Sequence, residues 1–139
     1  MSKHLYLIAV IFFWSMQTQA EEIQLTMSKK IEGNATVIYG TTNLPDGTKL
    51  GVSLTKGSKS GPQDYNIFVK KGYYESLPMT AYGNLLDSSY TVHLFTYFNQ
   101  MWQHDESIRE KLKSYTSPNL TPTHATGLKF EITKKLGDL

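Results

Sequence analysis

The sequence predicts an all-β protein in which about seven short antiparallel strands form two packed sheets, with one short helix inserted before the last strand. Three observations carry this prediction. Apolar and polar residues alternate with a period of two along most of the chain, which is the period of a strand. Turn-forming residues separate the alternating segments. Most gaps between segments are too short for a helical crossover, so the strands are expected to pair antiparallel.

The N-terminal segment, residues 1–20, has the pattern of a secretory signal peptide. An apolar run extends from Leu5 to Trp14, and small residues near Ala20 indicate cleavage after that residue. The run is shorter than the ~20 residues that a spanning helix needs. We therefore expect an exported bacterial protein, periplasmic or secreted, with a single β-sandwich domain at residues 21–139.

The predicted strands follow the alternation along the chain. Leu50, Val52 and Leu54 give the clearest case, because polar residues stand between them. Tyr65 is expected to share a face with Ile67 and Val69. The complete set of predicted strands is 23–28, 36–41, 49–55, 65–70, 73–77, 90–98 and 128–133.

Turn signals separate these strands. The Pro-Asp-Gly sequence at residues 45–47 and the Lys-Gly pair at 71–72 are typical of tight turns. Residues 57–62 and 83–89 are predicted loops. Connections of this kind are expected between neighbouring antiparallel strands.

A connection of about 28 residues, within 98–127, is too long for a structureless loop in a compact domain. Part of it is expected to be a helix at Ser107–Lys113. Ser107 and Glu110 have the spacing of a capping box, in which each side chain bonds to the backbone amide of the other. The apolar face of this helix is expected to consist of Ile108, Leu112 and Tyr115 and to lie on the sandwich.

Strands of this number and length are typical of an immunoglobulin-like antiparallel β-sandwich, with a small barrel as the alternative. The corner Asn43-Leu44-Pro45-Asp46-Gly47-Thr48, the hairpin Val69–Tyr74 and the strand entry Leu86–Val92 resemble motifs of small exported bacterial immunoglobulin-like modules. Ser89 stands where those modules have Gly. The resemblance covers roughly residues 36–92 and the last strand. It implies the fold and no shared catalytic residues.

Composition excludes several classes of function. The chain of 139 residues has no Cys, which excludes a disulfide framework, a thiolate nucleophile and Cys-based metal sites. A net charge of +2 is too small for a domain that holds nucleic acid. His93, His104 and His124 are accompanied by neither a nucleophile-elbow motif nor a His-x-x-x-His pair. We therefore expect no enzymatic activity, no metal site and no cofactor.

The strand at residues 90–98 is unusual because both of its faces carry apolar side chains. One face consists of Tyr90, Val92, Leu94 and Phe98, and the other of His93, Phe95 and Tyr97. Two interpretations are open. The inserted helix covers the second face by packing on Phe95 and Tyr97, or part of this aromatic surface stays open and binds a partner. The candidate binding residues are His93, Phe95, Tyr97, Trp102, His104 and Tyr115.

The function expected from these observations is binding to an envelope or secreted protein, without catalysis. A carbohydrate- or small-ligand-binding module that uses the same aromatic side chains is one alternative. A structural subunit of an envelope assembly, associating by strand addition at an exposed edge, is another. No nucleic-acid partner is expected, contact with a membrane is expected only through an uncleaved signal segment, and the sequence leaves the oligomeric state open.

Overall fold

The computed structural model describes residues 20–123 and 127–139. The predicted signal peptide therefore lies outside the described residues except for Ala20, and His124 also lies outside them. Strands make up 52% of the structure, and the larger sheets are antiparallel, which confirms the all-β prediction. None of the helices in the described ranges is long and apolar enough to cross a bilayer.

The elements alternate with short connections along most of the chain. The strands are β1 (Glu21–Glu22), β2 (Ser28–Glu32), β3 (Ala35–Thr41), β4 (Lys49–Lys56), β5 (Lys59–Phe68), β6 (Tyr73–Glu75), β7 (Thr91–Tyr97), β8 (Tyr115–Thr116), β9 (Leu120–Pro122) and β10 (Leu128–Lys135). The helices are α2 (Glu106–Leu112) and the 3-10 helix η1 (Leu136–Asp138). Several strands that the sequence did not predict are only two or three residues long.

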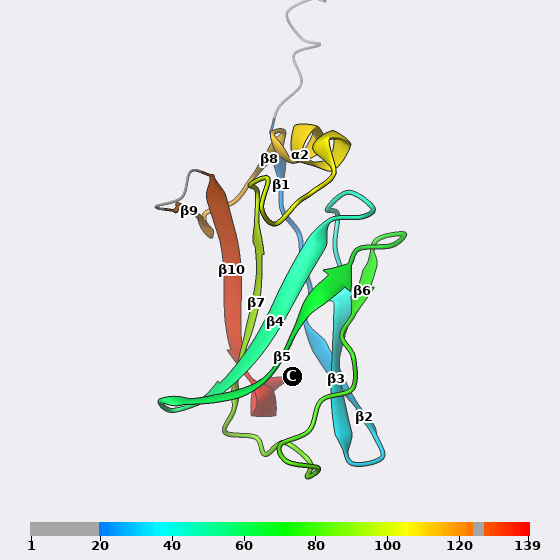
Figure 1. The fold of residues 1–139 in the computed structure, drawn as a ribbon, viewed down its shortest axis with the longest axis vertical. Helices are drawn as coiled ribbons and strands as arrows, with labels where there is room; N and C mark the ends of the chain where they lie inside the picture. The colour runs from blue at the N-terminus through cyan, green and yellow to red at the C-terminus, as the bar shows by residue number, and fades with distance from the viewer. Residues whose placement is uncertain (1–19, 124–126) are drawn as a thin grey trace, which may run out of the picture.

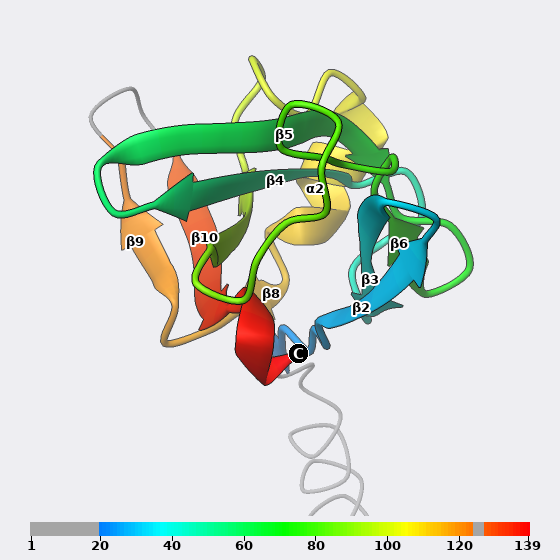
Figure 2. The same cartoon turned by 90° about the horizontal axis from the view of Figure 1, so that it is seen from below.

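Two antiparallel sheets form the body of the molecule. A five-stranded sheet has the order β5-β4-β7-β10-β9, and a three-stranded sheet has the order β2-β3-β6. The strands β1 and β8 form a small parallel pair beside α2 at one end of the molecule (Figure 1). Figure 2 shows the three-stranded sheet opposite the five-stranded sheet. The core side chains come from both sheets and from α2 and include Ile38, Leu50, Val52, Leu54, Tyr74, Val92, Leu94, Ile108, Leu112 and Phe130.

The predicted first strand, residues 23–28, is wrong in its bounds. Continuous pairing starts only at Ser28, in β2. Before it, the Ile23 N–H donates to the Thr116 carbonyl of β8 at 2.8 Å, whereas the Thr26 N–H donates to the end of β3 at 2.9 Å. The segment therefore crosses from β8 to the three-stranded sheet and has no single partner strand along its length.

A β-bulge in β5 changes which side chains face the core. β4 and β5 pair Leu50 with Ile67 and Val52 with Asp64, so β5 has one extra residue between these pairs. The extra residue shifts the alternation by one position. Ile67 and Asp64 are buried, whereas Tyr65 is 37% exposed. The expectation that Tyr65 shares the face of Ile67 is therefore wrong.

The predicted turns occur, with one difference in length. The backbone turns at Lys71 and Gly72 with φ of 52° and 75°, which is the left-handed conformation that a two-residue hairpin turn requires. The predicted loop at residues 57–62 is wrong, because β5 already begins at Lys59. Only Gly57 and Ser58 connect β4 to β5.

The helix α2 is capped by a residue other than the predicted one. Asp105 is the N-cap, and its carboxylate accepts the Ser107 N–H at 2.9 Å and the Ser107 hydroxyl at 2.7 Å. These hydrogen bonds, from the hydroxyl first and the amide second, lower the pKa of Asp105. Glu110 bonds instead to Lys113 at 2.6 Å, so the predicted capping box is wrong. The helix starts at Glu106, one residue earlier than predicted.

The position of α2 decides between the two interpretations of the second face of β7. Ile108 and Leu112 belong to the core cluster that contains Val92 and Leu94. The helix therefore closes one end of the core and does not pack on Phe95. The interpretation in which α2 covers the aromatic face is wrong.

Candidate binding surface

Four aromatic side chains gather on the face of the five-stranded sheet that points away from the core. We call Tyr65, Phe95, Tyr97 and Trp102 the outer aromatic surface. Tyr65 comes from β5, Phe95 and Tyr97 come from β7, and Trp102 comes from the turn that follows β7. Phe95 is 9% exposed and Tyr65 is 37% exposed, so the cluster has a buried centre and a more exposed margin.

Gly51 allows this cluster to form. Gly51 on β4 lies directly opposite Phe95 on β7. A Cβ atom at Gly51 would lie 2.6 Å from the Phe95 ring, so the ring occupies the space that a side chain would fill. Phe95 thereby reaches across β4 toward Tyr65 on β5, with ring centroids 5.5 Å apart.

The rings contact one another mainly at their edges. The centroid of Trp102 lies 5.5 Å from that of Phe95, 5.5 Å from that of Tyr97 and 6.0 Å from that of Tyr65. The interplanar angle is 64° for the pair with Tyr97 and 62° for the pair with Tyr65. Such tilted and edge-to-face pairs are favoured by the ring quadrupoles. The cluster is therefore a packed unit.

Hydrogen bonds to the backbone of Lys49 fix Trp102 in this cluster. The indole Nε1–H donates to the Lys49 carbonyl at 2.9 Å. The same carbonyl accepts the Thr96 hydroxyl at 2.6 Å and the Gln103 amide at 2.9 Å. Gln103 is buried, and its Oε1 accepts the Lys49 N–H at 2.9 Å. The side chain of Gln103 thus binds both polar backbone groups of Lys49 and holds the turn against β4.

Two lysines lie over the aromatic rings. The Lys49 Nζ is 4.5 Å from the centroid of Trp102, and the Lys129 Nζ is 5.4 Å from the centroids of both Phe95 and Tyr97. These are cation–π distances. The surface is therefore both aromatic and cationic.

Polar side chains continue the surface along the sheet. The His93 Nε2 lies 3.0 Å from the Thr55 hydroxyl, and its Nδ1 lies 3.6 Å from Glu131. The other Glu131 oxygen lies 2.5 Å from the Lys129 Nζ. Burial by itself lowers the pKa of Lys129, but its hydrogen bond and attraction to Glu131, together with Tyr97, outweigh burial and raise it. Lys129 therefore stays protonated at neutral pH.

These residues line a shallow groove of about 340 Å³ on the sheet. Its lining consists of Ser53, Thr55, Tyr65, His93, Phe95, Tyr97, Lys129 and Glu131, with Trp102 packed against its aromatic end. The groove offers apolar contact, hydroxyl and imidazole hydrogen bonding, and one ion pair.

The structure brings together four of the six predicted site residues: His93, Phe95, Tyr97 and Trp102. His104 is exposed in the turn before α2, and its backbone carbonyl accepts a hydrogen bond from the Arg109 guanidinium at 3.1 Å. Tyr115 lies on the core side, where its hydroxyl donates to the Asn43 carbonyl at 2.6 Å. These two residues are therefore not part of the groove.

Sequence reasoning missed Tyr65, Lys49, Lys129 and Glu131. Lys129 and Glu131 were detectable in principle, because they share the outer face of the predicted last strand. Tyr65 was not, because the bulge that turns it outward depends on its pairing with β4. The position of Tyr65 in the cluster therefore follows only from the register between β4 and β5.

The described residues contain no group of three or more His, Asp or Glu side chains arranged to hold a metal ion. The expected absence of metal and cofactor stays a prediction. Comparisons of the chain with protein-family models, with curated proteins and with solved structures gave no match.

Proposed function

We propose that the protein is an exported, immunoglobulin-like β-sandwich that binds another protein of the envelope or the exterior through its outer aromatic surface, without catalysis. The observation that carries the proposal is the gathering of four aromatic side chains on the face of the sheet that the core does not use. In protein interfaces a few residues carry most of the binding free energy, and Trp and Tyr are enriched among them.

The strand order supports the immunoglobulin-like arrangement. In such sandwiches the first, second and fifth strands share one sheet, and the third, sixth and seventh share the other. Here β2, β3 and β6 form one sheet, and β4, β7 and β10 are neighbours in the other. The fourth strand differs, because β5 pairs with β4, whereas the fourth strand of a constant-type domain belongs to the first sheet. The short strands β8 and β9 belong to the long connection before the last strand.

The lysines favour a protein partner over a carbohydrate. A sugar stacks on a flat, open ring face. The rings of Trp102, Phe95 and Tyr97 have lysine Nζ atoms over them, and their mutual contacts are tilted. Lys129 is paired with Glu131, whereas Lys49 has no acidic partner among the ion pairs of the described residues. Lys49 therefore provides positive charge beside apolar surface, which complements a partner with carboxylates. We therefore assign the groove to an acidic protein surface.

The test is partner capture with matched aromatic variants. Purified protein is immobilised and exposed to envelope and secreted fractions of its source organism. We expect Tyr65→Ala and Tyr97→Ala to weaken retention of the partner at least about tenfold, as loss of an interface anchor does. Tyr73→Ala is the control, because Tyr73 is exposed to a similar extent, 39% against 37% for Tyr65, but lies in the three-stranded sheet.

Equal capture by all variants would contradict the proposal. Retention on polysaccharide that the same two substitutions abolish, with no protein captured, would support the carbohydrate alternative. Circular dichroism of each variant checks that the fold is retained.

Export is tested separately. We propose that the signal segment is removed after Ala20, and N-terminal sequencing of the protein from its native host is expected to begin at Glu21. A mature chain that starts at Met1 would contradict this.

A further inference from the structure

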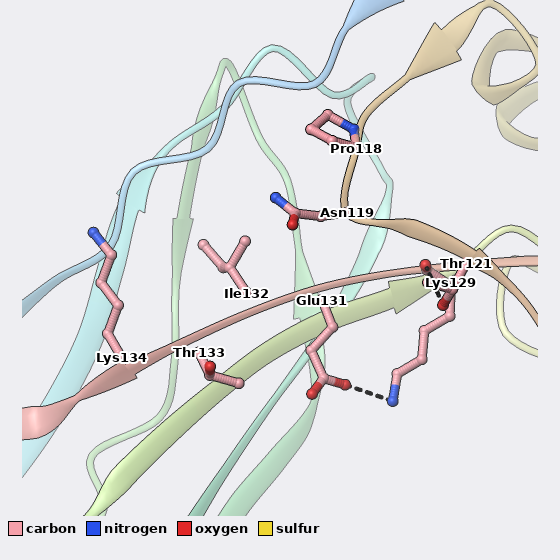
Figure 3. A pocket seen from close by; sticks show the side chains of 8 residues that line it. All are labelled: Pro118, Asn119, Thr121, Lys129, Glu131, Ile132, Thr133 and Lys134. Carbon is pink, nitrogen blue, oxygen red and sulfur yellow. Dashed lines mark hydrogen bonds and ion pairs between the residues drawn. The ribbon is translucent and has the colours of Figure 1, made fainter.

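One long edge of the five-stranded sheet is only partly covered. β10 pairs with β7 from Lys129 to Lys135 without a break in register. On its other side it pairs with β9 only from Leu128 to Phe130. Among the described residues, the segment Glu131–Lys135 therefore has a partner strand on one side only, and Figure 3 shows this stretch of β10 beyond the point where the chain of β9 departs.

The backbone groups at this edge point in a known direction. The Phe98 N–H donates to the Leu128 carbonyl at 2.8 Å, and the Leu136 N–H donates to the Tyr90 carbonyl at 2.8 Å. Even-numbered residues of β10 therefore turn their backbone groups toward β7. Since backbone groups alternate in direction along a strand, Thr133 and Lys135 turn their N–H and C=O groups toward the open side.

A groove of about 670 Å³ lies along the open edge. Ile132 and Lys134 project from β10 on the side of Asn119 and Pro118, as Figure 3 shows. Pro118 has no N–H group to donate, so the chain before β9 is poorly suited to continue the ladder here. Room is thus present for one more strand.

The opposite edge of the same sheet differs. β5 carries two register shifts against β4, and bulges of this kind protect edges from pairing with other chains. β10 is regular, and its exposed lysines give it a different protection. Lys134 and Lys135 have no acidic partner among the ion pairs of the described residues, whereas Glu131 is bound by Lys129. A second copy of this edge would bring more lysines to it, whereas an acidic strand would neutralise them.

We propose that the protein partner adds an extended acidic segment to the edge of β10, hydrogen-bonded to Thr133 and Lys135, with carboxylates beside Lys134 and Lys135 and an apolar side chain over Ile132. This inference rests on the proposed function, because it names how the same acidic partner is held. The edge and the outer aromatic surface adjoin, since Lys129 and Glu131 line both grooves.

The first test uses synthetic peptides. The probe is a blocked peptide of about eight residues, the length of an ordinary strand, in which one Val is placed to lie opposite Ile132 and two adjacent Asp residues to lie opposite Lys134 and Lys135. Bound peptide is expected to slow amide hydrogen exchange at Thr133 and Lys135. A version with Lys in place of Asp is expected to bind at least about tenfold more weakly, because like charges then face each other.

N-methylation tests the strand pairing itself. Two versions of the peptide carry N-methyl groups at alternate amides, one at each parity. Only the amides of one parity face β10, so one version is expected to lose binding and the other to keep it. Equal binding by both versions, or no protection of Thr133 and Lys135 at millimolar peptide, would overturn the inference.

The second test changes the protein. Thr133→Pro removes an N–H group that faces the open edge, where proline is tolerated, and Thr133→Val is the control that keeps it. Loss of one hydrogen bond is expected to weaken the acidic peptide about fivefold. Lys134→Glu leaves the backbone unchanged and is expected to weaken binding of the acidic peptide through charge repulsion. If Thr133→Pro does not fold, this variant tests whether the peptide binds at the edge of β10.

The two proposals fail in different ways. Partner capture that Tyr65→Ala abolishes but Thr133→Pro leaves intact would overturn strand addition and leave the proposed function standing. Partner capture that both substitutions reduce supports strand addition. Peptide binding at β10 with capture insensitive to the aromatic substitutions would support the edge site and contradict the outer aromatic surface as the interface.

Discussion

At the scale of single residues, the backbone of Lys49 connects the core to the candidate surface. Its carbonyl accepts hydrogen bonds from Thr96, Trp102 and Gln103. A partly buried carbonyl and amide need such partners, since each unpaired group carries a desolvation penalty. Gln103, 2% exposed, is therefore a structural residue that also sets the position of Trp102.

Replacement of Gln103 tests this role. We expect Gln103→Leu to lower the free energy of unfolding by about 1–3 kcal/mol, because the Lys49 N–H loses its acceptor in a partly buried place. Urea denaturation measures the loss. Gln100→Leu, at an exposed position of the same turn, is the control and is expected to change stability little. Equal stability of the two variants would contradict the assignment.

Residue-level prediction from the sequence succeeded where alternation was uninterrupted. Val92 and Leu94 face the core and His93 and Tyr97 face outward, as the period of two predicts. It failed at Tyr65, because a bulge is a property of two paired strands and leaves no signal in one of them. It also failed for Tyr115, whose side chain follows the core-facing path of the chain after α2.

At the scale of elements, α2 shows how a short helix depends on its first turn. A helix of this length is marginal by itself, so capping and burial of Ile108 and Leu112 together stabilise it. The sequence indicated the helix but not its cap, since both Asp105 and Ser107 are good N-cap residues. In the structure Asp105 takes the N-cap position, and Ser107 donates to its carboxylate.

The capping of α2 by Asp105 predicts that Asp105→Ala and Ser107→Ala lower the melting temperature by different amounts, and that the effect of Asp105→Ala depends on pH. We expect Asp105→Ala to lower the melting temperature by a few degrees at neutral pH and Ser107→Ala to lower it less, because the Ser107 N–H keeps its acceptor in the second variant. The pKa of Asp105 is lowered in the folded protein, so its contribution is present above the ordinary carboxyl pKa and is lost as the pH falls through the lowered value.

Melting curves recorded by circular dichroism from neutral to strongly acidic pH provide the measurement. The difference between wild type and Asp105→Ala is expected to shrink as the pH falls. If Ser107→Ala lowered the melting temperature more than Asp105→Ala at neutral pH, the capping-box prediction would be supported and the assignment of Asp105 as the cap would be contradicted.

At the scale of the whole molecule, one cluster of buried side chains forms the core of the described residues. Side chains of both sheets and of α2 meet in one cluster, and the chain has no Cys. A domain of this size buries about two thirds of its unfolded surface, which is enough for independent stability. The all-β class was predictable from alternation, whereas the positions of β1, β8 and β9 depend on long-range packing that alternation does not encode.

Removal of metal and reductant treatment test this self-sufficiency. We expect the chain from residue 21 to 139 to melt in one cooperative transition, with the same midpoint in chelator and in reductant as in plain buffer. Far-ultraviolet circular dichroism is expected to show a β-dominated spectrum. A midpoint that falls in chelator, or a gradual transition, would contradict the single unaided core.

The pairing of β1 with β8 has a consequence for maturation. Glu21 and Glu22 directly follow the proposed cleavage position, and the Glu21 N–H donates to the Ser114 carbonyl at 2.8 Å. A peptidase must bind the residues on both sides of the scissile bond in its active-site cleft. Glu21 and Glu22 would not be accessible to it while β1 is paired with β8. Cleavage after Ala20 would therefore precede the pairing of β1 with β8. The new amino terminus would then join the sheet as one of the last events of folding.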